Sequence, residues 1–242
     1  MFWRKQKAAI GRFHPLHKAL TLEKGFSVSL RRDDWEPVIQ SLAGHDAVVK
    51  RRKWRLSERV PGVFVPMLRV LAADMPPEGV LSVAADMRGP TVPEKNGPKQ
   101  ALPNRGQISS MQQWYAFDPW LRMRAELRDG SVVELELIDR VRNRSYNKRS
   151  ASGKLKMKHK TKTVHLVRVT RRLAKDAAVQ RPPSPPPGWL RVQVKEGKRL
   201  VIRASARFPG MLENQAMTDR ILQVSTEPFR WTPPGTAARR TK

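Results

Sequence analysis

RVRNRSYNKRSASGKLKMKHKTK, residues 140–162, contains ten Lys or Arg among 23 residues and no Asp or Glu. Five of the lysines occupy every second position, namely Lys154, Lys156, Lys158, Lys160 and Lys162. On a helix this spacing would scatter the ammonium groups around the cylinder, whereas on a strand it puts all five on one face. Thr161, Thr163 and Val164 also favour a strand. The spacing therefore predicts a cationic β-strand.

The residues upstream alternate in the same way. Basic side chains stand at Arg140, Arg142, Arg144 and Lys148. The segment 150–153 supplies turn chemistry between the two basic runs. We therefore expect residues 133–170 to form a long β-hairpin whose far half, residues 140–162, is a cationic arm. The alternative is a solvated, mobile loop; the alternation over five lysines favours the hairpin.

The sequence of the hairpin before this stretch, residues 120–141, predicts how its two strands pair. Apolar residues alternate on both sides of an Asp-Gly turn: Leu121, Met123, Ala125 and Leu127, then Val133, Leu135 and Leu137. A two-residue loop would set Ala125 opposite Glu134 and mix the two faces. A three-residue loop, 128–130, with Gly130 left-handed in a bulge, pairs Arg124 with Glu134 instead. It likewise pairs Arg122 with Glu136, so that one face is apolar and the other is charged.

Composition sets wider limits. The 242 residues suffice for one large β domain, and seven Trp with a hydrophobic fraction of 39% argue against wholesale disorder. The net charge of +27 indicates a polyanionic partner, because such a surface repels itself unless negative charge lies nearby. The chain has no cysteine, which excludes disulfides and thiolate metal sites. It has no run of 18 apolar residues, so no membrane span is expected.

We expect a mainly β protein, an antiparallel sandwich or open barrel built from hairpins, with one or two short helices and the long basic arm. Residues 1–22 are interpreted as a flexible basic arm rather than a transit peptide, because Gly11 and Pro15 would interrupt an amphipathic helix. We expect residues 23–179 to form the main antiparallel β domain, 180–188 a Pro-rich spacer and 189–242 a C-terminal β-hairpin region that packs on the main domain. The spacer is interpreted as a stiff polyproline II linker, although it could be a ligand for a proline-recognising domain.

Shorter elements are also predicted. Strands are expected at 25–30, 63–73 and 79–85, and a short helix from Asp33 or Asp34 to Gly44. Residues 88–110 should form a long loop. Residues 211–222 are a possible helix, whereas 221–224 could open a final strand, and the tail 233–242 should be frayed.

A second cationic block covers residues 50–55, five of whose six residues are basic. Its Trp54 could stack on a base. The commoner arrangement has such a Trp covering the edge of a core while the charges stay solvated.

Catalytic chemistry is largely missing from the sequence. No phosphate-cradling glycine loop and no Ser nucleophile between two glycines occurs. His14 and His17 have the spacing of a metal pair, but no carboxylate or thiolate lies near them. Asp33 with Asp34 fits a helix start, and Glu134 with Glu136 fits salt bridges, better than either fits an acid–base pair.

We therefore expect a non-enzymatic, cytoplasmic protein without a cofactor that binds nucleic acid, RNA or DNA, with little sequence specificity. The alternative is a structural subunit of a large assembly whose arm docks on an acidic protein surface; anionic lipid is a weaker possibility. The expected contact residues in the arm are Arg140, Arg142, Arg144, Tyr146, Lys148, Arg149, Lys154, Lys156, Lys158, Lys160 and Lys162. Those in the second block are Lys50, Arg51, Arg52, Lys53, Trp54 and Arg55. Among the arm residues Tyr146 is the expected stacking aromatic.

Overall fold

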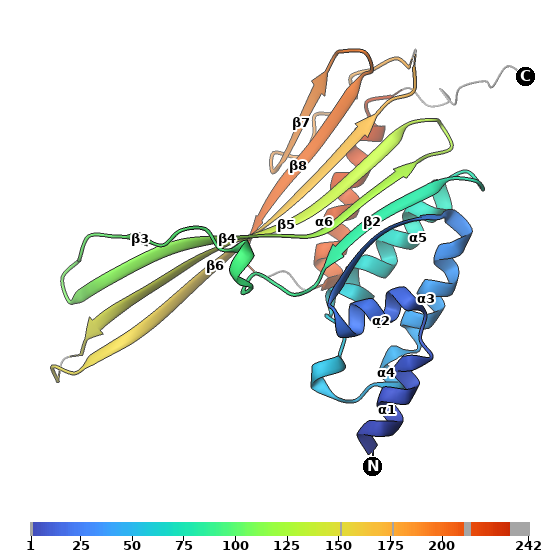
Figure 1. The fold of residues 1–242 in the computed structure, drawn as a ribbon. Coiled ribbons are helices and arrows are strands. Elements are labelled where there is room, and N and C mark those ends of the chain that lie inside the picture. Colours follow the sequence, from blue (N-terminus) through green and yellow to red (C-terminus); the bar gives the residue numbers. More distant parts are fainter. Residues whose placement is uncertain (1, 151, 176, 211–213, 233–242) are drawn as a thin grey trace, which may run out of the picture.

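A computed structural model describes residues 2–150, 152–175, 177–210 and 214–232. Within this part of the chain one antiparallel sheet has the strand order β1-β2-β4-β5-β6-β8-β7, and β3 pairs with β4 (Figure 1). The strands are β1 (Gly25–Arg31), β2 (Val80–Asp86), β3 (Gln100–Ala101), β4 (Ile108–Glu126), β5 (Val132–Arg149), β6 (Leu155–Arg172), β7 (Leu190–Lys195) and β8 (Val201–Pro209). The α-helices are α1 (Phe2–Gly11), α2 (Pro15–Leu22), α3 (Trp35–Ala43), α4 (His45–Val48), α5 (Val65–Asp74) and α6 (Asn214–Thr226).

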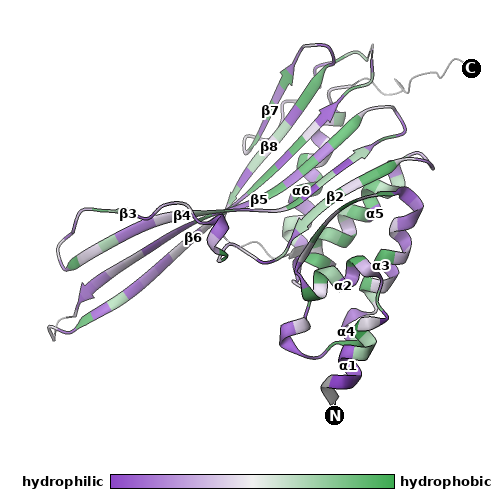
Figure 2. Cartoon of the chain, viewed as in Figure 1, coloured by the Kyte–Doolittle hydropathy of each residue, from purple (hydrophilic) through white to green (hydrophobic). Residues whose placement is uncertain are grey.

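Helices cover one face of the sheet in the body of the molecule (Figure 1). The core lies between these helices and the strands beneath them, and Figure 2 shows hydrophobic residues on both. Its largest fully buried side chains include Trp35 and Phe64 from the helical layer and Leu121, Met123 and Leu135 from the sheet. Burying one such side chain contributes about 1.5–3 kcal/mol.

The mainly β, antiparallel prediction is confirmed, but the sandwich or barrel is not. In the described residues the sheet is single and open, with β1 and β7 at its edges. The second layer is helical, which also corrects the expectation of one or two short helices. Residues 63–73 contribute most to this difference. They lie in a π-helix, Val60–Phe64, and in α5, and do not form a strand. Their apolar residues on all sides fit a helix packed in a core as well as a buried strand.

Residues 2–22 form helices where the sequence suggested a flexible arm. The segment forms α1 and α2, and Ile10, His17 and Leu20 are buried. Pro15 begins α2 instead of breaking a longer helix, because its missing N–H and fixed φ suit the first helical position. His14 caps that helix by accepting a hydrogen bond from the backbone N–H of Leu16.

The register predicted for the β4–β5 hairpin is confirmed. Ala125 lies opposite Val133, Arg124 opposite Glu134 and Arg122 opposite Glu136. Gly130 has φ +74°, the left-handed conformation that the three-residue loop requires. The strand at 25–30, the strand at 79–85 and the helix that ends at Gly44 are also confirmed, within one or two residues at their ends.

The C-terminal part joins the same sheet. Strand β8 pairs with β6 from Val164↔Pro209 to Arg172↔Val201, and β7 pairs with β8. The Pro-rich segment therefore connects two parts of one sheet and does not divide two domains. Residues 221–224 lie within α6 and not in a strand, and the expected frayed tail, 233–242, lies outside the described residues.

Candidate polyanion-binding face

Three strands continue beyond the body as a projection (Figure 1). We call this projection the arm and define it as residues 108–117 of β4, 140–149 of β5 and 155–163 of β6. Strand β8 pairs only with residues 164–172 of β6, so β6 forms an edge of the sheet throughout the arm. The other edge, on β4, is partly covered by β3 and by Gly97, whose N–H donates to the carbonyl of Tyr115 at 2.8 Å.

The register of the arm gathers its charges on one side. Residues directly opposite each other in neighbouring antiparallel strands share a face. Arg142 lies between Tyr115 of β4 and Lys162 of β6, and every second residue follows the same rule. The resulting set, which we call the cationic face, comprises Arg140, Arg142, Arg144 and Lys148 of β5 and Lys156, Lys158, Lys160 and Lys162 of β6.

Cations on this face stand directly opposite one another. The pairs are Arg142↔Lys162, Arg144↔Lys160 and Lys148↔Lys156. Their Cβ atoms are about 4.5–5.5 Å apart in such a ladder, and like charges at that separation are destabilising. Among the residues that the structure describes, no carboxylate lies within 4.0 Å of any cation of the cationic face. The four lysines of β6 are exposed. The face is thus a cluster of positive charge that the described part of the chain does not neutralise.

On strands β4, β5 and β6 of the body, by contrast, arginines have carboxylate partners. On the side that continues from the cationic face, Arg172 donates to Glu134 at 2.7 Å, and Arg122 lies 3.5 Å from Glu136. The hydrogen bond and charge of Arg172 lower the pKa of the Glu134 carboxyl below its ordinary value, although burial opposes this. Along β4, β5 and β6, positive charge is therefore compensated in the body and uncompensated on the arm. Figure 2 shows the arm as mostly hydrophilic.

Two aromatic side chains on the cationic face were not predicted. Tyr115 and Phe117 of β4 lie opposite Arg142 and Arg140, and they are 43% and 47% exposed. The run of aromatic and apolar residues from Trp114 to Phe117 was a signal for them, because such residues favour strands. The hairpin was expected to begin at Trp120, but β4 continues through Pro119, which lies where the register shifts, at a bulge that tolerates its missing N–H.

Two expected arm contacts fall elsewhere. Arg149 lies opposite Leu155, one position out of phase with the cationic residues, and therefore points to the other face of the arm. Lys154 precedes β6, where its carbonyl accepts a hydrogen bond from the Ser150 N–H. The opposite face of β6 holds Leu155, Met157 and His159, which carry no carboxylate.

The second basic block, residues 50–55, lies in the helical part of the body and not on the arm. Trp54 is only 8% exposed and packs with Ile10 and Val49. The Lys53 ammonium lies 4.5 Å from the centroid of its ring. The ring therefore closes a small core, which is the commoner arrangement expected from the sequence.

A buried polar cluster lies where the arm meets the body. Asp118, Asp139 and His165 form one row across β4, β5 and β6. The Lys95 ammonium lies 2.5 Å from Asp118, and Arg59 bonds to Asp139. His165 Nδ1 is 2.6 Å from Asp139 Oδ1. These contacts hold the three long strands together at the root of the arm.

Burial and pairing act in opposite directions on the two carboxyls of this cluster. Burial raises the pKa of Asp118 above its ordinary value, in spite of Lys95 and Arg59. Burial would also raise the pKa of Asp139, but the hydrogen bond with His165 and the charge of Arg59 outweigh it, and the pKa lies below its ordinary value. Among the described residues no group of three or more His, Cys, Asp or Glu could hold a metal ion.

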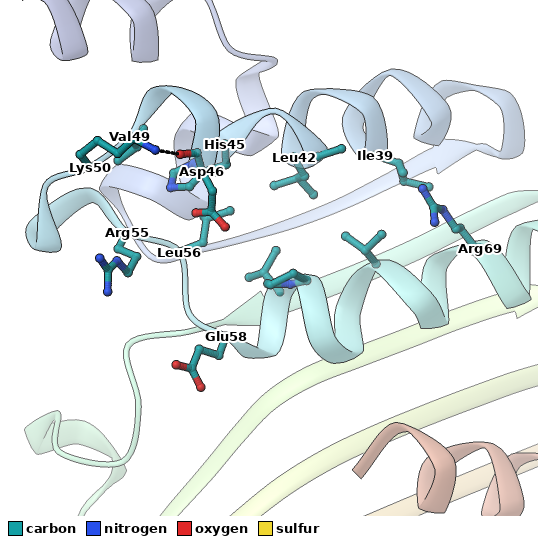
Figure 3. Close-up of a pocket in the computed structure, with 14 residues that line it drawn as sticks. Ile39, Leu42, His45, Asp46, Val49, Lys50, Arg55, Leu56, Glu58 and Arg69 are labelled. Carbon is teal, nitrogen blue, oxygen red and sulfur yellow. Dashed lines mark hydrogen bonds between the residues drawn. The ribbon is translucent and has the colours of Figure 1, made fainter. Parts of the chain in front are cut away.

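A cavity of about 560 Å³ lies in the helical layer among α3, α4 and α5 (Figure 3). Its apolar lining includes Ile39, Leu42 and Val65. Figure 3 shows Arg69 at one end and both acidic and basic side chains at the other. Because charges of both signs surround it, the cavity does not extend the cationic face.

None of the helices in the described part of the chain is both long and apolar enough to cross a membrane. Comparisons of the chain with models of protein families, with curated proteins and with solved structures give no match.

Proposed function

We propose that this protein binds nucleic acid without catalysis, through the cationic face of the arm. The observation that carries the proposal is that eight Lys and Arg share one face without a carboxylate partner among the described residues. Three directly opposed like-charged pairs make this arrangement unfavourable for the protein alone. A bound polyanion would remove that repulsion.

The spacing of the cations suits a phosphate backbone. Alternate residues on a strand advance about 6.8 Å, roughly twice the 3.4 Å rise per nucleotide of one DNA strand. The lysines from Lys156 to Lys162 therefore span about 20 Å, the length of several phosphates. Point charges of this kind follow the backbone and convey little sequence information. Binding should accordingly be weakly specific.

Protection of a sheet edge is a simpler explanation for part of the pattern. Lysines on an exposed edge strand prevent pairing with other chains, and this accounts for the lysines of β6. It does not account for Arg140, Arg142, Arg144 and Lys148, because β5 lies between β4 and β6 in the interior of the sheet. The basic residues of the central strand favour binding.

An assembly subunit whose arm docks on an acidic protein surface is the alternative, since the same unneutralised cations would serve it. The purified protein distinguishes the two. Bound nucleic acid raises the absorbance at 260 nm and is released by high salt, whereas an unbound protein with a clean spectrum at low salt favours the acidic-protein alternative.

The direct test compares two variants that each lose four positive charges. One changes Lys156, Lys158, Lys160 and Lys162 to Gln on the arm, and the other changes Lys50, Arg51, Arg52 and Lys53 to Gln in the body. Affinity is measured with 20-nucleotide RNA and DNA of mixed sequence at low salt. We expect the arm variant to lose at least about a hundredfold and the body variant far less. Equal losses would reject the arm as the binding element.

A further inference from the structure

We infer that the cationic face takes an unpaired strand of nucleic acid, whose bases stack on Tyr115 and Phe117 while its phosphates contact the neighbouring cations. This inference rests on the proposed function and specifies the form of its substrate. Two such rings are unusual on a solvated sheet face. Tyr115 is 43% exposed and Phe117 is 47% exposed, and both lie beside charged side chains.

The cationic face interleaves aromatic rings with cations. Tyr115 and Phe117 alternate on β4, directly opposite Arg142 and Arg140, and Tyr146 of β5 lies opposite Lys158. Aromatic rings interleaved with cations are the arrangement by which proteins hold single strands, since every base offers a π-face and every nucleotide a phosphate. In a duplex the base faces are hidden in the stack, so the ring of Phe117 would have no partner.

Neighbouring side chains position the Tyr115 ring. The Arg140 guanidinium lies 6.0 Å from the centroid of the Tyr115 ring. Gln113 donates to the Tyr115 hydroxyl at 3.3 Å and accepts from Arg144 at 2.7 Å. Positions two apart on a strand are separated by about 6.8 Å, twice the stacking distance of about 3.4 Å. This spacing leaves room for one base between neighbouring rings.

The width of the arm also favours a single strand over a duplex. Neighbouring strands are about 4.8 Å apart, so the outer backbones of three strands lie about 10 Å apart before side chains are added. The major groove of B-DNA is about 12 Å wide and admits a two-stranded ribbon, and the minor groove is about 6 Å wide. The major groove of an RNA duplex is narrow and deep. The arm is too broad to enter these grooves, whereas a single strand can lie along its face.

The experiment compares an unstructured 20-nucleotide strand with a blunt 20-base-pair duplex, each as RNA and as DNA, on the full chain at low salt. The variant Tyr115→Thr with Phe117→Thr removes both rings and keeps strand-forming residues. The matched control, Leu155→Thr with Met157→Thr, removes two exposed apolar side chains, 59% and 66% exposed, from the opposite face of the arm. Tyr115→Phe keeps the ring and loses only the hydroxyl.

We expect the intact chain to prefer the single strand. The double ring variant should lose at least about tenfold in affinity for the single strand, with its affinity for the duplex unchanged. The control and Tyr115→Phe should bind as the intact chain does. Preference for the duplex, or an unchanged single-strand affinity in the ring variant, would overturn the inference and leave the proposed function standing. Failure to bind either form would reject the proposed function, and the inference with it.

Discussion

Lys95 compensates a fully buried carboxylate, and its own side chain is only 7% exposed. Its ammonium lies 2.5 Å from Asp118 and 2.9 Å from Asp86. The hydrogen bond from Arg88, with Lys95 assisting, holds the pKa of Asp86 far below its ordinary value, whereas burial raises that of Asp118. Lys95 is therefore the main partner that offsets the burial of the Asp118 carboxylate.

The variant Lys95→Met should lower the free energy of unfolding by about 3 kcal/mol or more at pH 7, because it leaves a buried carboxylate without its main partner. The deficit should shrink as the pH falls, since protonation neutralises Asp118, and adding Asp118→Asn should recover much of it. Urea denaturation measures these changes, with the exposed Lys198→Met as control. A loss no larger than that of the control would contradict this role of Lys95.

Two buried histidines form a second polar contact that depends on pH. His17 Nε2 lies 2.8 Å from His45 Nδ1, and the Phe13 ring stacks on His17 at 3.9 Å between centroids. Burial, then the neighbouring His45 and His14, lower the pKa of His17 from 6.5 to about 4. The hydrogen bond between the two rings requires a neutral acceptor, so protonation of both would break it.

Stability should consequently fall as the pH falls from neutrality. In the unfolded chain His17 binds a proton near pH 6.5, whereas in the folded chain it does so only near pH 4, so protons favour unfolding between these values. His17 alone should cost about 2 kcal/mol between pH 7.5 and pH 5.0. Urea denaturation at the two values should show a smaller difference for His17→Gln. The same difference in both proteins would contradict the assignment.

At the level of residues, the sequence predicted a contact correctly where the two-residue period of a strand determines which side chains face each other. Arg124 with Glu134 follows from strand alternation and one turn type. The contact of Lys95 with Asp118 joins a loop to a strand 23 positions away, and no periodicity connects them. Tyr115 and Phe117 were missed because the hairpin was expected to begin at Trp120, whereas β4 begins at Ile108.

The arm as an element carries an internal electrostatic strain. Its three opposed like-charged pairs should together cost about 1–3 kcal/mol at low ionic strength. Salt screens such exposed charges, because the Debye length falls below about 8 Å above physiological ionic strength. The body strands, whose arginines pair with Glu134 and Glu136, lack this strain.

Hydrogen exchange tests the strain directly. Amide protection in residues 141–149 and 155–162 should rise at least about fivefold, relative to residues 133–138 of the same strand β5, between 20 and 300 mM NaCl. Addition of single-stranded RNA at low salt should have the same effect. Salt that leaves the ratio of arm to body protection unchanged would show that the opposed charges do not strain the arm.

At the level of elements, alternation predicted strands well and apolar runs predicted them badly. Residues 121–127 and 133–137 alternate and are strands, whereas 63–73 are apolar on all sides and form α5. The helical layer was underestimated for this reason, and residues 1–22 were assigned to an arm because Gly11 and Pro15 were expected to interrupt a helix. Ile10, His17 and Leu20 of this segment are buried.

The whole molecule combines a helix-covered body with a projecting cationic face. Its net charge is +27, and its cations differ in whether a carboxylate lies beside them. Glu134 and Glu136 on the exposed sheet face lie beside arginines of the body, and the arm has no Asp or Glu. Composition alone predicted a polyanionic partner but not its docking surface. The pairing of β5 with β6 aligned the two basic runs, and the register of β4 added the aromatic residues.

The salt dependence of affinity for a single-stranded 20-mer tests the central claim most directly, because each phosphate contact releases counterions. For the eight cations of the face, log K against log salt concentration should have a slope of roughly −5 to −6. Changing Lys156, Lys158, Lys160 and Lys162 to Gln should make the slope shallower by about 3 units. A slope that stays the same in this variant would contradict binding through the cationic face.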